Sequence, residues 1–544
     1  MERFNFLDVG GCFLILIAPF LHYLEFIDYP FLTSEGFMIL IGFLLFSFLL
    51  FAFIPTQSYL LRCLLFTNII MITFDFSTLP FVPAAASTIA TPLLLFMVFL
   101  FLWFLRKNMS VLLLVMFFTV NLSTLILMLI EDTASFEGDE NTIASADNEA
   151  LPNVLHLYLD GLIGIEGIPQ DLHDGKALAQ DFKNFFRIND FQTFGGAHSS
   201  YYRSIYSITG MLNFNNSPKK LRENIEIIEK NYAITYKLKR NAYFKKLHEQ
   251  GYNINVYQAE FMDFCDPLYV QAKDCFMYMQ NAPDRKAMGH LGFGERLKLL
   301  WYTFAREQAI VEKLIYYQLH LSSTFTMLPQ NSPLLKMLVS VGAMSISSVI
   351  DKIAQDVTSS KGGNVYFAHV LIPHSPYIWN AQCHLKKSSE TWASPFLELK
   401  NWVIPSAKRV DLYREYFKQV RCVKLKLQNL FTHMKKSGNF ENTIIVIHSD
   451  HGSRIAENTS VYVENHAVSS RDMQDGFSTL FAIKIPGEPA SYDHGMKSLN
   501  KIFFKYMGKG VEQTDTHEGA VFFEIPELDA DELSEDYWQR MPIH

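Results

Sequence analysis

The distribution of apolar residues divides the chain into two parts with different patterns. A helix needs about 20 apolar residues to cross the hydrocarbon core of a bilayer. The first part therefore predicts a helical transmembrane domain over residues 1–130 with about five spans, or four because Arg62 and Asn68 interrupt the third. The apolar stretches run over 9–27, 36–54, 58–76, 90–105 and 110–130.

Beyond these stretches the pattern changes twice. Residues 131–151 are rich in acidic and small side chains and lack periodicity, which predicts a linker. Residues 152–544 alternate buried strands with helical segments, which is typical of an α/β domain with a central mixed sheet. Strands are expected at 154–160, 252–258, 364–372, 443–449 and 479–485, and helices at 236–250, 294–320, 343–357, 408–436 and 494–507.

The basic residues of the first part predict its orientation. Arg3, Arg62, Arg106 and Lys107 are the only basic side chains before residue 131, and the loops between them carry only acids. By the positive-inside rule, the N-terminus is expected in the cytoplasm. An odd number of spans then predicts a multi-pass protein of the inner (plasma) membrane, with the α/β domain on the periplasmic or extracellular side. The apolar segment 331–350 is expected to be a core or interfacial helix.

Composition adds two further constraints. The net charge of −8 gives no reason to expect a nucleic-acid partner. Two of the six cysteines fall in predicted spans, and the four that remain allow three disulfide connectivities. The pairs Cys265–Cys275 and Cys383–Cys422 are favoured over the other pairings, and four free thiols are the alternative.

Charged side chains follow two of the predicted buried strands. Asp160 ends the first strand, and Asp450 and His451 follow the strand at 443–449. An unpaired carboxylate in apolar surroundings costs several kcal/mol, roughly. A divalent cation removes that cost, because carboxylate and imidazole become its ligands. Ligands of α/β sheets collect beyond the carboxyl ends of the strands, so these residues are expected in one crevice.

Several segments resemble, in chain order, the alkaline phosphatase/sulfatase superfamily. They are "PNVLHLYLDG", "HSSYYRSIYSITGMLN", "YFAHVLIPHSPY", "IIVIHSDHGSR" and "FSTLFAIKIPG". The chain looks most like the membrane-anchored sulfatase-like group, which includes phosphoethanolamine transferases and lipoteichoic acid synthases. The resemblance implies a sulfatase-like α/β domain in which a nucleophile accepts a phosphoryl or sulfuryl group beside a divalent cation.

The resemblance also implies roles for particular residues. It makes Ser204 the nucleophile, with Ser207 three positions later, and leaves Ser199 and Ser200 as rivals. Hard carboxylate oxygens with an imidazole suit Zn²⁺ or Mn²⁺. The expected metal ligands are Asp160, Ser204, Asp450 and His451.

A second group of residues is expected to bind the substrate. His369 and His374 resemble the histidines of the family that contact the transferred group or a second metal. Arg203 and Arg454 are placed to hold an anionic phosphoryl group, with surface ion pairs as the alternative. His466 is the first of three later candidates for a second site, and His494 and His517 are the others.

Departures from the family pattern rank the possible functions. Sulfatases have an Arg at the position of Ile208 and a Cys or Ser that becomes formylglycine, and this chain has no Cys nearby. Ser204 and Asp160 stand where well-studied transferases have Thr and Glu. The first expectation is a metal-dependent transferase that moves a phospho-alcohol group, such as phosphoethanolamine or phosphoglycerol, from a phospholipid to a cell-envelope glycan or lipid through a covalent seryl intermediate. The alternatives are a phosphodiesterase or sulfuric ester hydrolase, and an inactive membrane binding protein.

Overall fold

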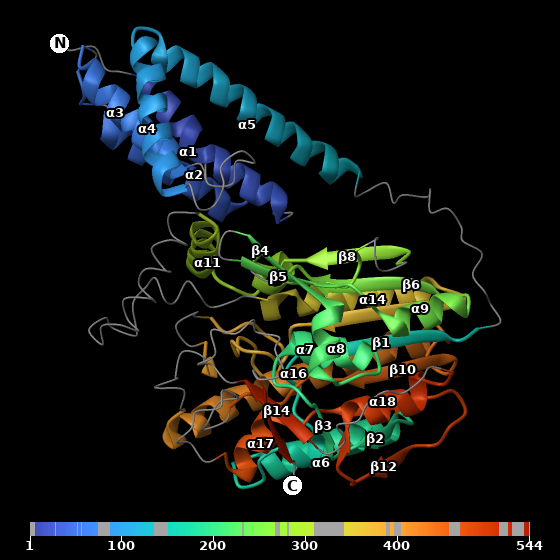
Figure 1. The fold of residues 1–544 in the computed structure, drawn as a ribbon. Coiled ribbons are helices and arrows are strands. Elements are labelled where there is room, and N and C mark those ends of the chain that lie inside the picture. Colours follow the sequence, from blue (N-terminus) through green and yellow to red (C-terminus); the bar gives the residue numbers. More distant parts are fainter. Residues whose placement is uncertain are drawn as a thin grey trace. The chain divides into compact units, whose positions relative to one another are not determined.

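A computed structural model of the chain divides it into two compact units (Figure 1). The first comprises residues 1–143 and 291–338, and the second comprises residues 144–290 and 339–544. The structure describes residues 6–27, 29–51, 53–55, 57–73, 87–134, 151–230, 233–266, 272–279, 282–308, 342–387, 392–395, 404–455, 468–510, 520–524 and 538–542. Most of the predicted linker lies outside these residues.

The first unit contains five N-terminal helices at the five predicted apolar stretches. Within the described residues, three of them are long and apolar enough to cross a membrane: α1, α2 and the Met109–Ile126 part of α5. The other two are shorter apolar helices, so the number of spans stays a prediction. The helices are α1 (Phe6–Phe26), α2 (Ser34–Phe51), α3 (Tyr59–Thr73), α4 (Ser87–Phe104) and α5 (Met109–Ala134).

A buried polar cluster joins the beginnings of α1, α3 and α5. Nη2 of Arg62 lies 2.6 Å from Oδ1 of Asp8 and 2.6 Å from Oγ of Ser110, and all three side chains are buried. Charged groups among apolar helices are costly unless they pair in this way. Each residue stands within the first turns of its helix, so the cluster joins the same ends of α1, α3 and α5.

Helix α11 (Phe293–Arg306) also falls in the first unit, although the sequence pattern assigned it to the α/β domain. The ring of Phe304 lies 5.1 Å from that of Phe20 in α1. Nε of Arg296 lies 3.3 Å from a carboxylate oxygen of Glu35 at the beginning of α2. The apolar face of α11 is therefore buried against the N-terminal helices, which periodicity alone does not reveal.

An eight-stranded mixed sheet forms the centre of the second unit (Figure 1). Its order is β12-β2-β11-β10-β1-β9-β6-β8, and β10, β1, β9, β6 and β8 are mutually parallel. β1 and β9 are buried at every position and mainly apolar, as is typical of central parallel strands. The strands are β1 (Asn153–Leu159), β2 (Gln192–Phe194), β6 (Asn253–Ala259), β8 (Asp274–Tyr278), β9 (Asn364–Val370), β10 (Thr443–His448), β11 (Phe481–Lys484) and β12 (Ser491–Asp493).

Shorter elements surround this sheet. The small strands are β3 (Ala197–His198), β4 (Ile225–Lys230), β5 (Ala233–Leu238), β7 (Met262–Asp263), β13 (Lys497–Ser498), β14 (Ala520–Glu524) and β15 (Trp538–Pro542). The helical elements are η3 (Ile165–Gly167), α6 (Gly175–Ile188), α7 (Ser204–Leu212), α8 (Pro218–Asn224), α9 (Ala242–Glu249), α10 (Arg285–Met288), η4 (Gly342–Ser345), α14 (Ile346–Ser359), α16 (Ser406–Lys436), α17 (Ser470–Phe477) and α18 (Leu499–Met507).

Helices cover both faces of the central sheet. The core on one face joins the sheet to α7, α9 and α18 through residues such as Ile208, Phe244 and Phe503. The other face is covered by α14, α16 and α6, where the rings of Phe185 and Phe431 stack 5.6 Å apart. The predicted α/β architecture with a mixed sheet is therefore confirmed.

The five predicted strands and the two favoured disulfides are present. Cys265 pairs with Cys275, and Cys383 pairs with Cys422. The helix predicted over 236–250 is wrong at its beginning, because β5 ends at Leu238 and α9 starts at Ala242. The segment "AITYKL" in β5 contains the β-branched Ile234 and Thr235 and the aromatic Tyr236, which suit a strand.

Candidate active site

The register of three parallel strands brings the expected site residues to one edge of the sheet. Tyr158 in β1 lies opposite His448 in β10 and opposite His369 in β9. Asp160 follows β1 by one residue and Asp450 follows β10 by two, so both carboxylates lie beyond the same carboxyl ends. This edge is where open α/β sheets bind ligands.

Two carboxylates and two imidazoles converge at this edge. Oxygen or nitrogen ligand atoms of Asp160, His369 and Asp450 all lie within 4.8 Å of one another. Nε2 of His451 lies 3.1 Å from Oδ1 of Asp160 and 3.3 Å from Oδ2 of Asp450. Nε2 of His369 lies 3.4 Å from Oδ2 of Asp160. The structure therefore places His369, expected to contact substrate, among the candidate metal ligands.

The orientation of the His451 ring shows why these groups fit a cation. Its Nδ1 lies 2.7 Å from the Gly452 carbonyl oxygen, to which it donates, so Nε2 is the ring nitrogen that remains for a ligand. This Nε2 atom faces two carboxylates. Oδ1 of Asp160, Oδ2 of Asp450, Nε2 of His451 and Nε2 of His369 are buried and have no hydrogen-bond partner among the residues that the structure describes. These four convergent ligand atoms fit a divalent cation, which neutralises the carboxylate charges.

The charge of Asp160 is maintained by its neighbours. Burial by itself raises the pKa of this carboxyl, but the imidazoles of His374, His369 and His451 hold the pKa well below its ordinary value. Burial lowers the pKa of His374, and Arg454 and His451 lower it further while Asp160 opposes them. The site thus keeps the Asp160 carboxylate charged, as metal binding requires.

The expected nucleophile lies at the beginning of α7. Ser204 is the first residue of this helix and is 9% exposed, and its hydroxyl bonds to no residue that the structure describes. One turn later, Oγ of Ser207 donates to the backbone oxygen of Asp450 over 2.7 Å, which ties α7 to the metal-ligand loop. The rivals have other contacts: Oγ of Ser199 donates to the Tyr201 oxygen, and Oγ of Ser200 accepts from Asn216. These contacts favour Ser204.

The remaining candidates are distributed unevenly. Arg454 donates to the Tyr202 oxygen over 2.6 Å, and the ring of Tyr202 stacks on His451, which places Arg454 beside the cluster. Arg203 caps α7 directly before Ser204. His494 is largely exposed and lies 2.8 Å from a carboxylate oxygen of Glu166. His466 and His517 lie outside the described residues.

Sequence reasoning missed the residues that hold the ligand loops. Ser449 accepts from the Leu162 amide and donates to the carboxylate of Asp450, at 2.8 and 3.2 Å. Tyr416 in α16 donates to the Gly161 oxygen and accepts from the Ile163 amide, at 2.8 and 2.9 Å. The only sequence signal for Tyr416 is an aromatic residue on the buried side of a long amphipathic helix.

A second part of α16 holds the loop after β10. Arg409 forms a buried, bidentate ion pair with Asp475, with its shortest nitrogen–oxygen distance at 2.7 Å. The backbone oxygen of Asp475 accepts from the Arg454 amide over 2.9 Å. A Cβ on Gly452 would lie 2.3 Å from that same oxygen, so this close approach requires glycine.

The chain is similar to one family model and, at low identity, to several solved structures. A family model described as "Protein of unknown function (DUF229)", a sulfatase-like family, matches residues 409–468, which contain most of α16, β10 and the Asp450–His451 pair. No curated protein matches the chain. Solved structures similar to the chain include a member of the alkaline phosphatase superfamily, the group that the sequence motifs resemble.

Three of these solved structures illustrate the level of similarity. A protein in the alkaline phosphatase superfamily from Vibrio parahaemolyticus has a TM-score of 0.36 and 11% identity, covering 66% of this chain and 67% of that chain. The phosphonate monoester hydrolase SpPMH from Silicibacter pomeroyi has a TM-score of 0.38 and 13% identity, covering 69% of this chain and 79% of that chain. The C-terminal periplasmic domain of EcEptC from Escherichia coli has a TM-score of 0.37 and 11% identity, covering 66% of this chain and 83% of that chain. At this level, the activity and substrate of the chain rest on its own residues.

Proposed function

We propose that this chain is a metal-dependent transferase that moves a phospho-alcohol group from a phospholipid to a cell-envelope glycan or lipid. The observation that carries the proposal is the convergence of Asp160, His369, Asp450 and His451, with unpaired acceptor atoms, beside the beginning of α7. Zn²⁺ or Mn²⁺ bound there would act as a Lewis acid and would lower the pKa of a serine hydroxyl.

The proposed transfer takes place in two steps at Ser204. In the first, Oγ of Ser204 bonds to phosphorus as the bond from phosphorus to the diacylglycerol oxygen breaks, and the serine proton ends on the released diacylglycerol. In the second, an acceptor hydroxyl displaces Ser204, which recovers its proton. The N-terminus of α7 carries partial positive charge, which stabilises a phosphoryl group on Ser204. Arg454 and Arg203 are proposed to hold its free oxygens.

The apolar N-terminal helices support a lipid donor. Three of the described helices are able to cross a membrane, which exceeds the single span that tethering needs. We infer a multi-pass protein of the plasma membrane whose catalytic unit faces the periplasmic or extracellular side, where both a phospholipid head group and an envelope acceptor are within reach.

The test uses the full-length protein loaded with Zn²⁺ in vesicles that contain phosphatidylethanolamine or phosphatidylglycerol. We expect release of diacylglycerol and an adduct on the Ser204 peptide, whose mass identifies the group moved. Ser204→Ala should abolish both, whereas Ser199→Ala should retain the adduct. Turnover of donor without an acceptor would indicate a hydrolase instead. Failure to bind metal, with no adduct, would indicate an inactive binding protein.

A further inference from the structure

Helix α16 carries a buried stripe of polar and aromatic side chains. The stripe consists of Arg409, Tyr413, Tyr416, Gln419 and Cys422, which are all at most 2% exposed. Each of them lies three or four residues from the next, so consecutive members are neighbours and the stripe winds around the helix. Long polar side chains are rarely buried without a specific partner, so each of them marks a contact that the helix must make.

Gln419 makes its contacts with the loop that carries His374. Its Oε1 accepts from the backbone amides of Ile378 and Trp379, at 2.8 and 3.2 Å. Its Nε2 donates to the backbone oxygens of Pro373 and His374, at 3.1 and 2.9 Å. One side chain thus binds the backbone on both sides of the His374 turn, so the turn cannot move without breaking several of these bonds.

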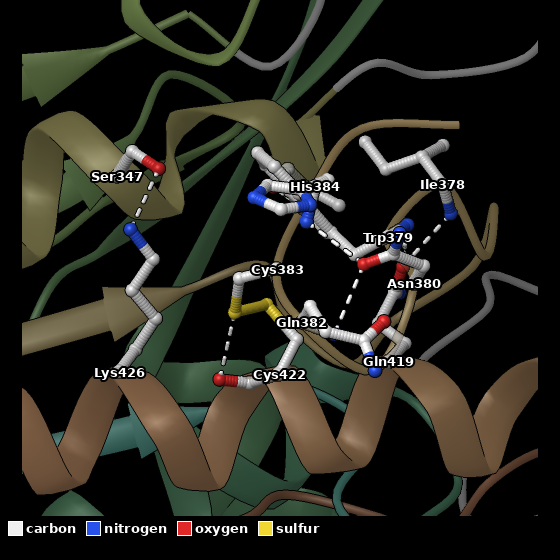
Figure 2. The surroundings of a disulfide bond; sticks show 11 residues. Ser347, Ile378, Trp379, Asn380, Gln382, Cys383, His384, Gln419, Cys422 and Lys426 are labelled. Atoms are coloured by element: carbon white, nitrogen blue, oxygen red, sulfur yellow. Dashed lines mark hydrogen bonds between the residues drawn. A yellow bond between two sulfur atoms is a disulfide. The ribbon is translucent and has the colours of Figure 1, made fainter. Parts of the chain in front are cut away.

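The same loop is attached to α16 a second time. Cys422, three residues after Gln419, forms the disulfide with Cys383 (Figure 2). Between these attachments, Oδ1 of Asn380 accepts from the amides of Gln382 and His384, at 3.0 and 2.9 Å, which makes a tight turn. Figure 2 shows Gln419 and the disulfide on adjacent turns of the helix, both directed at this loop.

His374 itself belongs to the cluster beyond the strands. Its ring lies 6.3 Å from the ring of His451, and its Nδ1 lies 2.7 Å from the Ser375 oxygen, to which it donates. The Nε2 atom is therefore the acceptor or protonation site that remains for a ligand. Tyr416 binds the loop after β1, and Arg409 and Tyr413 bind Asp475 and the loop after β10. All three loops of the site are therefore attached to one helix.

We propose that the buried stripe of α16 aligns the three loops of the site, and that Gln419 is the positioning residue that aims His374 at the phosphoryl group. The proposal rests on the proposed function, because it requires a phosphoryl group at the site. Groups that orient site residues need placement within about 0.5 Å, which a single rigid helix provides better than separate loops.

The experiment measures two affinities of the full-length protein by calorimetry: that for Zn²⁺, and that of the Zn²⁺-loaded protein for inorganic phosphate. In Gln419→Met we expect phosphate to bind about 10-fold more weakly, by analogy with the loss of groups that orient metal ligands. His374→Ala should weaken phosphate at least as much. Adding Gln419→Met to His374→Ala should cause no further loss, because Gln419 acts through His374. The matched control is Gln428→Met, an exposed glutamine of the same helix.

A second pair of variants keeps the proposal testable if Gln419→Met does not fold. Replacing Cys383 and Cys422 with serine should weaken phosphate binding, whereas replacing Cys265 and Cys275 with serine should not. An unchanged phosphate affinity in Gln419→Met or in the first serine pair overturns the positioning role, as does full additivity with His374→Ala. Wild-type protein that binds Zn²⁺ but no phosphate overturns the proposed function, and the inference with it.

Discussion

The ion pair between Arg409 and Asp475 allows a sharp prediction about stability. Both side chains are at most 2% exposed, and Tyr413 donates to the same carboxylate. Breaking a buried pair by removing one partner costs roughly 3–5 kcal/mol, because the other charge stays buried. In Arg409→Met we therefore expect a large loss of stability. Arg414→Met is the matched control, since Arg414 and its partner Asp411 are exposed on the same helix and such pairs contribute about 0.2–1 kcal/mol.

The assay is thermal unfolding of the purified full-length protein, followed by the fluorescence of buried tryptophans such as Trp379. If each kcal/mol lowers Tm by roughly 2 °C in a unit of this size, Arg409→Met should lose roughly 6–10 °C and Arg414→Met less than roughly 2 °C. Asp475→Asn in the Arg409→Met background should recover at least half of the loss, because the buried charge is gone.

The pH dependence of that variant provides an independent check. Burial raises the pKa of the Asp475 carboxyl, and Arg409 opposes that rise. Without Arg409 the folded protein takes up a proton at a higher pH than the unfolded chain does, so its stability should increase as the pH falls. The deficit of Arg409→Met should thus be smaller at pH 5.5 than at pH 8. A Tm within 2 °C of wild type at pH 8, or a double variant no better than the single, would refute the reasoning.

Three further predictions concern other buried polar groups. Zn²⁺ at 100 times its Kd should stabilise wild type by about 2.7 kcal/mol and so raise its Tm. Asp160→Asn should remove this increase in Tm, and an equal increase in the variant would contradict the site. Burial lowers the pKa of His448 to about 4, so the folded state does not take up a proton that the unfolded chain accepts below about pH 6.5. The free energy of unfolding should therefore fall by about 3 kcal/mol between about pH 6.5 and about pH 4. Replacing His156 and His448 with Leu should reduce this loss of stability in denaturation measured across that pH range. Arg62→Met should leave Asp8 buried without its cation and reduce the folded fraction in detergent chromatography, and Asp8→Asn should restore it.

Much of the architecture was predictable because it depends on local patterns. Continuous apolar runs predict central strands, and runs of about 20 apolar residues predict membrane helices, because burial on all sides excludes polar side chains. The same logic made Asp160 and Asp450 candidate site residues, since a buried strand that ends in a carboxylate needs a partner. The two disulfides are the pairing that was favoured among the three connectivities of the four cysteines outside the predicted spans.

Residue types and their places after predicted strands were enough to propose the candidate site residues, but how these residues meet depends on the tertiary structure. Only the pairing of β1 with both β9 and β10 places His369 with Asp160 and Asp450, because register depends on contacts between segments far apart in the chain. Likewise, Gln419 and Tyr416 look like ordinary residues of an amphipathic helix until the loops that they bind are present. A polar side chain is solvated or buried according to its partner, and the partner is chosen by the fold.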